Sequence, residues 1–278
     1  MSEVNALLDD AEVALADGRF DDAEKNCRAV IALEARNTDA WFLLGETLRD
    51  TGRLEEAEGA YRFVVLNASE SDEARQRALA AESWAALSGT LLEQLRWDEA
   101  RKAANRALRE NPNSAEGAWV RAILRERRAD YAGATRDYLR AWRVDPAGYP
   151  LPIPLDDETV DDIVVECLEQ FHPSLRSFLA NVVILLEEVP SQELLEQYDP
   201  PAAPTHILGY FSGTSLQERS LEDPWSNLPG AIVLFRRNLS RYARDRDELI
   251  QELRITIFHE VGHFLGLDED DLEKRGLD

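Results

Sequence analysis

The segment GRLEEA at residues 52–57 has three related copies in the first half of the chain. The copies are GRFDDA at 18–23, LRWDEA at 95–100 and DYAGA at 130–134. The final alanines of successive copies are 34, 43 and 34 residues apart. A period of about 34 residues is typical of helix pairs that stack into a solenoid. The longer middle step predicts an insertion of nine residues around 70–77.

Aromatic and small residues recur at matching positions of these copies. They are Trp41, Leu44, Gly45, Tyr61, Trp84, Leu87 and Tyr138, with Pro112 and Pro146 closing the last two copies. The pattern resembles the tetratricopeptide repeat (TPR) family. The resemblance implies about four repeats, each a pair of antiparallel helices that a small Ala lets approach closely. Two positions depart from the family, since Leu95 replaces the usual turn glycine and Cys27 replaces a common aromatic.

Solenoids of this family commonly present a concave groove to a peptide or protein. The resemblance therefore implies a protein partner or substrate docked in the groove, and the alternative is a scaffold for folding or oligomerisation. Several arginines could line a groove for an acidic tail or could simply be exposed helix residues. These are Arg49, Arg53, Arg121, Arg125 and Arg128.

Composition restricts the class of protein further. The formal net charge of −23 argues against nucleic acid or anionic membranes as partners, because phosphates are bound by clustered Lys and Arg. Residues 1–147 hold 21 basic and 28 acidic side chains, so most of the net charge resides in the second half. This acidity could favour cationic substrates, or it could serve only as a solvated surface. No apolar stretch is long enough for a membrane span and the N-terminus is acidic, so we expect a cytoplasmic protein. Cys27 and Cys167 are far apart in sequence and are expected to be buried and unpaired.

A proline-rich segment separates the two halves. Residues 145–156 contain four prolines and one glycine, which exclude a helix. We therefore predict a repeat domain at 1–147, a linker at 148–158 and a second domain at 159–278. The second domain is expected to contain a helix at 156–171, strands at 181–187, 206–211 and 231–235, loops at 190–205 and 212–229, and a final helix at 244–265.

The final helix carries the segment HEVGH at residues 259–263. At 100° per residue its apolar positions fall on one stripe: Leu249, Leu253, Ile257, Val261, Phe264 and Leu265. His259 and His263 lie about 40° apart on a different face, so both imidazoles can direct a nitrogen at one zinc ion about 2.0–2.1 Å away. Zinc lowers the pKa of bound water towards about 7, and Glu260 beside it is placed to act as general base in amide hydrolysis.

A catalytic zinc also needs a third protein ligand. Gly266 is placed to end the helix in a left-handed cap and to turn the chain back. The acidic run that follows makes Glu269 the first candidate, with Asp270 and Asp268 as alternatives, while a solvated tail is the other interpretation.

Residues from about 160 to 278 resemble the minimal zincin-like metallopeptidase family of bacteria. The match includes LGYFSG at 208–213, a strand-like IVLFRRNL at 232–239 and HEVGHFLG at 259–266. The resemblance implies a compact α/β fold with one zinc held by His259 and His263, and with Glu260 as catalytic acid and base. Phe211 stands where the family often has Tyr, and Glu269 where it commonly has Asp.

The expected fold is therefore α+β and multidomain, an all-α TPR solenoid followed by a small α/β zincin-like domain. The predicted function is that of a zinc metallopeptidase acting on a peptide or protein substrate that the repeats recruit or restrain. The alternative is an interaction scaffold whose zincin-like domain binds metal without catalysis. A third hypothesis is that the repeats inhibit the site by covering it.

Overall fold

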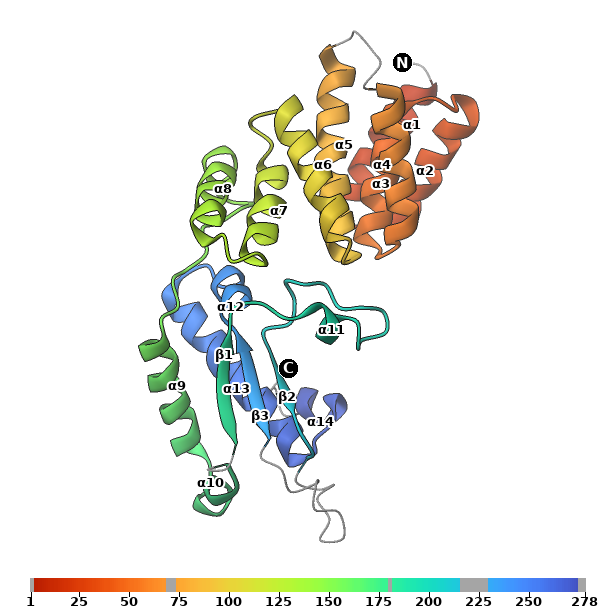
Figure 1. The fold of residues 1–278 in the computed structure, drawn as a ribbon. Coiled ribbons are helices and arrows are strands. Elements are labelled where there is room, and N and C mark those ends of the chain that lie inside the picture. The colour runs from red at the N-terminus through yellow and green to blue at the C-terminus, as the bar shows by residue number, and fades with distance from the viewer. Residues whose placement is uncertain (1–2, 69–73, 180–181, 216–229, 275–278) are drawn as a thin grey trace. The chain divides into compact units, whose positions relative to one another are not determined.

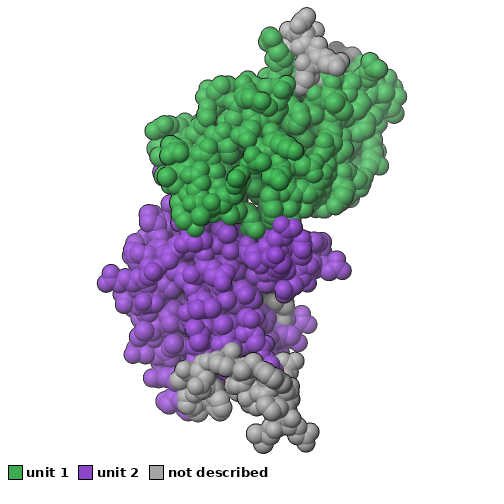
Figure 2. All heavy atoms as spheres, in the orientation of Figure 1, with its two compact units in different colours: residues 1–149 green, residues 150–278 purple. Residues whose placement is uncertain are grey.

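The computed structural model describes residues 3–68, 74–179, 182–215 and 230–274. The chain divides into two compact units, Met1–Tyr149 and Pro150–Asp278, which are coloured separately in Figure 2. Between Val144 and Asp157 the chain forms neither helix nor strand. None of the helices in the described part of the chain has the length and apolar character needed to cross a bilayer.

The described part of the first unit consists of helices alone, which pair in sequence order (Figure 1). They are α1 (Glu3–Ala16), α2 (Phe20–Leu33), α3 (Thr38–Asp50), α4 (Leu54–Ala68), α5 (Ala74–Glu93), α6 (Trp97–Glu110), α7 (Ala115–Glu126) and α8 (Tyr131–Val144). Each pair corresponds to one copy of the sequence pattern, so the predicted helical solenoid is confirmed.

Small residues at the repeated positions allow this packing. The four alanines that end the sequence copies are at most 2% exposed. Gly45 of α3 lies against Tyr61 of α4, where an added Cβ would come within 2.7 Å of the phenol ring. Trp119 and Tyr138 pack edge to face in the last repeat, with ring centroids 4.8 Å apart. Contacts of small residues with aromatic rings and of aromatic rings with one another therefore hold the two helices of a repeat together.

The turn inside each repeat keeps one backbone conformation whatever residue occupies it. Gly18 and Gly52 have φ of 71° and 74°, and the corresponding Leu95 and Ala129 have φ of 59° and 57°. A left-handed conformation costs a non-glycine L-residue about 1–2 kcal/mol. The third and fourth repeats therefore retain the turn geometry at the expense of backbone strain.

The predicted insertion lengthens a helix. Helix α5 has 20 residues, whereas α3 has 13 and α7 has 12. Residues 70–73 of the insertion lie outside the described residues, and α5 begins directly after them at Ala74.

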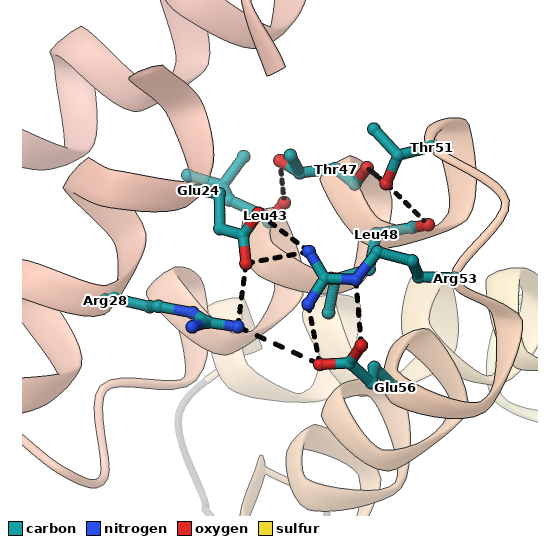
Figure 3. A network of polar contacts seen from close by, with 8 residues as sticks. All are labelled: Glu24, Arg28, Leu43, Thr47, Leu48, Thr51, Arg53 and Glu56. Carbon is teal, nitrogen blue, oxygen red and sulfur yellow. Dashed lines mark hydrogen bonds and ion pairs between the residues drawn. The ribbon is translucent and has the colours of Figure 1, made fainter. Parts of the chain in front are cut away.

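An arginine at the turn links neighbouring repeats. Arg53 donates to both carboxylate oxygens of Glu24 on α2, at 2.8 and 2.9 Å, and also to Glu56 on α4 (Figure 3). Arg96, at the same position of the next repeat, pairs with Glu58 in the same way, at 2.5 Å. Arg53 thus joins the second repeat to the first, and Arg96 joins the third repeat to the second.

The second unit combines helices with a small sheet (Figure 1). Its elements are α9 (Asp157–Gln170), α10 (Pro173–Leu179), β1 (Val183–Glu187), α11 (Gln192–Leu195), β2 (Gly209–Ser212), β3 (Ala231–Phe235), α12 (Arg236–Tyr242), α13 (Arg246–Leu265) and α14 (Glu269–Glu273). Within the described residues, β3 is central, with β1 parallel on one side and β2 antiparallel on the other. Helices α9 and α13 pack together and share an apolar core with the sheet.

Most predicted elements of this unit lie where expected, and β3 coincides with the strand predicted at 231–235, whereas the rest of the strand-like segment 232–239 is helical. Helix α12 starts at Arg236 because polar side chains bind the neighbouring loops there. Arg236 and Arg237 contact Glu188 at 3.1 and 2.6 Å, and Asn238 donates to the carbonyls of Pro204 and Ile207. The loop predicted at 190–205 contains the short helix α11, and residues 216–229 of the second predicted loop lie outside the described residues, as does Asn181.

Both cysteines are buried and free, as expected from their spacing. Burial raises the pKa of the Cys27 thiol to about 12 and that of Cys167 to about 11. Neither thiol is therefore activated as a nucleophile.

Candidate metal and catalytic site

Helix α13 separates a buried face from a face that lines a cavity. Its predicted apolar stripe is buried at Leu249, Leu253, Ile257, Val261 and Phe264, and Leu265 is half-buried. His259 and His263 lie on the other side and line a cavity of about 660 Å³. The helical periodicity of the sequence thus places the two imidazoles correctly.

The two histidines form a close pair. Their Nε2 atoms lie 3.0 Å apart, and their ring centroids 4.7 Å apart. In a tetrahedral zinc site, with Zn–N distances of about 2.0–2.1 Å, two nitrogen ligands are about 3.3 Å apart. The pair is therefore close to the spacing that one zinc ion requires.

The end of α13 orients His263. Gly266 caps the helix in the left-handed conformation with φ of 87°, as predicted, and the Leu267 amide returns to the carbonyl of Gly262 at 3.0 Å. This turn places the Leu267 carbonyl 3.2 Å from Nδ1 of His263. Since a carbonyl oxygen only accepts hydrogen bonds, Nδ1 carries the proton. Nε2 therefore keeps its lone pair, which is the one that a metal ion would bind. A backbone partner for the distal nitrogen is a common feature of metal-binding histidines.

Glu260 lies beside the pair. Its side chain is only 5% exposed, and it lines the same cavity. Two imidazole nitrogens, one of them on a ring held by a backbone carbonyl, are ligands that suit zinc. A buried carboxylate next to them suits hydrolytic chemistry.

The acidic run after α13 folds into the short helix α14. Asp268 is its N-cap, with Oδ1 accepting from the amide of Asp271 at 2.9 Å, and the side chain of Asp270 is exposed. Glu269 is the first residue of α14, but its side chain lies outside what the structure describes. Among the described residues, no third His, Cys, Asp or Glu joins the histidine pair as a metal-binding group. The third ligand therefore stays a prediction.

The walls of the cavity come from loops and from β2. Residues of β2 and the preceding loop face α13, and Gly209 allows this approach because an added Cβ would lie 2.8 Å from the Thr256 methyl group. Phe211, at the position where the family often has Tyr, packs edge to face on Phe264 at 5.7 Å. Tyr210 instead stacks on Phe235 at 5.9 Å, and burial raises the pKa of its phenol.

Sequence reasoning did not identify several residues of this cavity. The residues concerned are Tyr198, His206, Tyr242 and Glu252. Helical spacing could have indicated Glu252, which precedes His259 by seven residues and so shares its face of α13. The others lie on or beside connecting segments, whose positions depend on tertiary contacts.

The candidate groove arginines of the first unit are mostly paired with carboxylates. Arg121 and Arg125 both bind the buried carboxylate of Asp137, at 2.6 and 3.2 Å. Arg49 binds Glu116 at 2.6 Å, and Arg53 forms the contacts described above. A cavity of about 370 Å³ beside α6 and α7 is lined by arginines, among them Arg128, but most of their charge is neutralised within the unit.

Comparisons with known proteins match both units. The sequence model of the tetratricopeptide repeat matches residues 8–71 and 86–150, and that of the zincin-like metallopeptidase family matches residues 179–277. No curated protein matches the chain.

Solved structures resemble part of the chain. MamA is 20% identical with a TM-score of 0.42, covering 51% of this chain and 73% of MamA. PilF of Pseudomonas aeruginosa is 19% identical with a TM-score of 0.45, and the match covers 61% of this chain and 70% of the PilF chain. A TPR protein of Thermus thermophilus is 18% identical with a TM-score of 0.41, covering 51% and 74%.

Proposed function

We propose that this chain, which joins tetratricopeptide repeats to a zincin-like metallopeptidase domain, is a zinc-dependent peptidase. The observation that carries the proposal is the pair of Nε2 atoms 3.0 Å apart, with the buried Glu260 in the lining of the same cavity. A purely structural metal site would have no need of that carboxylate.

His259 and His263 would hold the ion, with Glu269 as the proposed third ligand and Asp270 or Asp268 as alternatives. Zinc supplies Lewis-acid polarisation of a carbonyl and of water. Glu260 accepts a proton from the attacking water as the C–O bond forms, and it returns that proton to the leaving amine as the C–N bond breaks. Burial keeps bulk water away from this carboxylate.

The substrate would lie along β2. This strand pairs only with β3 among the described strands, so its other edge presents backbone groups next to the cavity. An extended peptide can add to such an edge through main-chain hydrogen bonds. We propose peptide or protein substrates for this reason, and we assign the repeats to docking of the substrate or of a protein partner.

The test is hydrolysis of a mixed peptide library by the zinc-loaded full chain, followed by mass spectrometry. The Glu260→Gln variant should retain zinc and lose at least about 100-fold in kcat. Glu169→Gln is the matched control, because Glu169 is exposed on α9 and outside the cavity. Equal cleavage by wild type and Glu260→Gln, or zinc binding without any cleavage, would rule out the peptidase and leave a metal-binding interaction module.

A further inference from the structure

The cavity contains a second carboxylate in line with the histidines. Glu252 lies on α13 seven residues before His259, which is about 10 Å along the helix axis at 1.5 Å per residue. Both residues line the same cavity, and Thr256 lies between them on the same face. The backbone of β2 approaches the helix at this point, since Gly209 lies against the Thr256 methyl group.

Glu252 is half-buried and has no cationic partner within the described residues. No salt bridge or side-chain hydrogen bond of its carboxylate occurs there, and the described lining of the cavity includes no Lys or Arg. Its desolvation, with a smaller effect of Glu248, raises the pKa of this carboxyl. A partly desolvated carboxylate without a counter-ion is unfavourable until a cation binds it.

The rest of the cavity suits a long cationic side chain. Ile255 provides an aliphatic surface next to Glu252, and the partly exposed rings of Tyr198 and Tyr242 line the same space. Lys and Arg bury their methylene stems on apolar surface while the charged end is bound, and aromatic faces attract the cation. An acidic side chain would meet like charge from Glu252.

We propose that Glu252 determines substrate specificity by binding the side chain of a Lys or Arg about three residues from the scissile bond. The distance follows from the 10 Å separation and a rise of about 3.4 Å per residue in an extended peptide. This inference rests on the proposed peptidase function for the position of the scissile bond, but the recognition of a basic side chain does not depend on turnover.

Two measurements on the full chain test the proposal. The first is the cleavage-site profile of wild type, Glu252→Gln and Glu252→Arg on a peptide library. Wild type should prefer Lys or Arg at one position by about tenfold or more in kcat/KM, Glu252→Gln should lose that preference, and Glu252→Arg should favour Asp or Glu. Asp247→Asn is the control, since it removes an exposed carboxylate of the same helix outside the cavity.

The second measurement is binding without turnover. Fluorescence anisotropy on the Glu260→Gln background compares peptides that carry Lys or norleucine at each position, with and without Glu252→Gln. Tighter binding of one Lys peptide that disappears with Glu252→Gln supports the proposal even if wild type cleaves nothing, in which case only the peptidase function fails. An unchanged cleavage profile in Glu252→Arg, or equal affinity for the Lys and norleucine peptides, overturns it.

Discussion

Nε2 of His259 and Nε2 of His263 face each other across 3.0 Å, one helical turn apart on α13. A rigid helix sets their spacing, and the Leu267 carbonyl fixes the orientation of the second ring. In the proposed zinc site these two imidazoles would need little reordering when the metal binds, and a third ligand would then complete the coordination.

Replacement of His263 should abolish metal binding. Wild type is expected to hold about one zinc per chain after dialysis, and His263→Ala none, because the single remaining imidazole binds zinc weakly. Elemental analysis of the purified proteins measures this directly. His172→Ala is the control, since His172 is exposed and outside the cavity. Equal zinc in His263→Ala and wild type would place the metal elsewhere.

Substitutions in the acidic run test the proposed third ligand. We expect Glu269→Gln to weaken zinc binding by more than about tenfold, because it replaces an anionic ligand with a neutral amide. Asp268→Asn should change it little, since Asn also caps a helix. Competition with a chelating dye measures both affinities. If Asp270→Asn weakens binding and Glu269→Gln does not, the ligand is Asp270.

The cap at Gly266 should couple folding to the metal site. A φ of 87° is unfavourable for alanine by about 1–2 kcal/mol, so Gly266→Ala should lower the stability of the second unit by that order. The shifted Leu267 carbonyl should also weaken zinc binding by about 10–100-fold. Gly266→Asn, which tolerates the left-handed region better, should be milder in both measurements. A Gly266→Ala variant with unchanged zinc affinity would show that the Leu267 contact does not orient His263.

The sequence was sufficient to predict those parts of the structure that follow a regular spacing of residues. The recurring alanines predict the helix pairs, and a spacing of four residues on an amphipathic helix predicts the histidine pair. The sequence did not predict the parts whose conformation or position depends on tertiary contacts. Arg236 starts a helix because Glu188 lies nearby, which no local pattern reveals. Tyr198, in a connecting segment, and Tyr242, at the end of α12, line the cavity for the same reason.

A half-buried carboxyl in the first unit should make the stability of that unit depend on pH. Glu46 accepts a hydrogen bond from Tyr61 at 2.5 Å, and its burial raises the pKa of the carboxyl. A raised folded-state pKa means that this stabilising contribution is complete below the unfolded-state pKa and is lost as pH rises through the folded-state value. The stability of Glu46→Gln relative to wild type should therefore increase as pH rises above the unfolded-state pKa of the Glu46 carboxyl.

Urea unfolding followed by tryptophan fluorescence suits this test, because five of the six tryptophans lie in the first unit. Glu55→Gln, an exposed carboxylate on α4, controls for the change in net charge. A stability difference between Glu46→Gln and wild type that does not vary with pH would mean that Glu46 titrates alike in the folded and unfolded states.

Ala129 is the place where a glycine should stabilise the protein. Its φ of 57° carries the strain of a left-handed L-residue, and its side chain is exposed, so little packing is lost by removing the methyl group. Relief of about 1 kcal/mol or more is partly offset by the greater freedom of glycine in the unfolded chain, and we expect a net gain of about 0.5 kcal/mol. The same urea unfolding measures it.

The same substitution at another position, Ala78→Gly, should lower the stability of the protein instead of raising it. Ala78 is also exposed, but it lies within helix α5, where glycine costs about 1 kcal/mol. At Leu95, which has a similar φ of 59° but is only 7% exposed, the loss of buried side chain should outweigh the relief of strain. If Ala129→Gly destabilises the protein as much as Ala78→Gly does, the left-handed turn of the fourth repeat is not strained. The glycines at the turns of the first two repeats would then not be explained by relief of such strain.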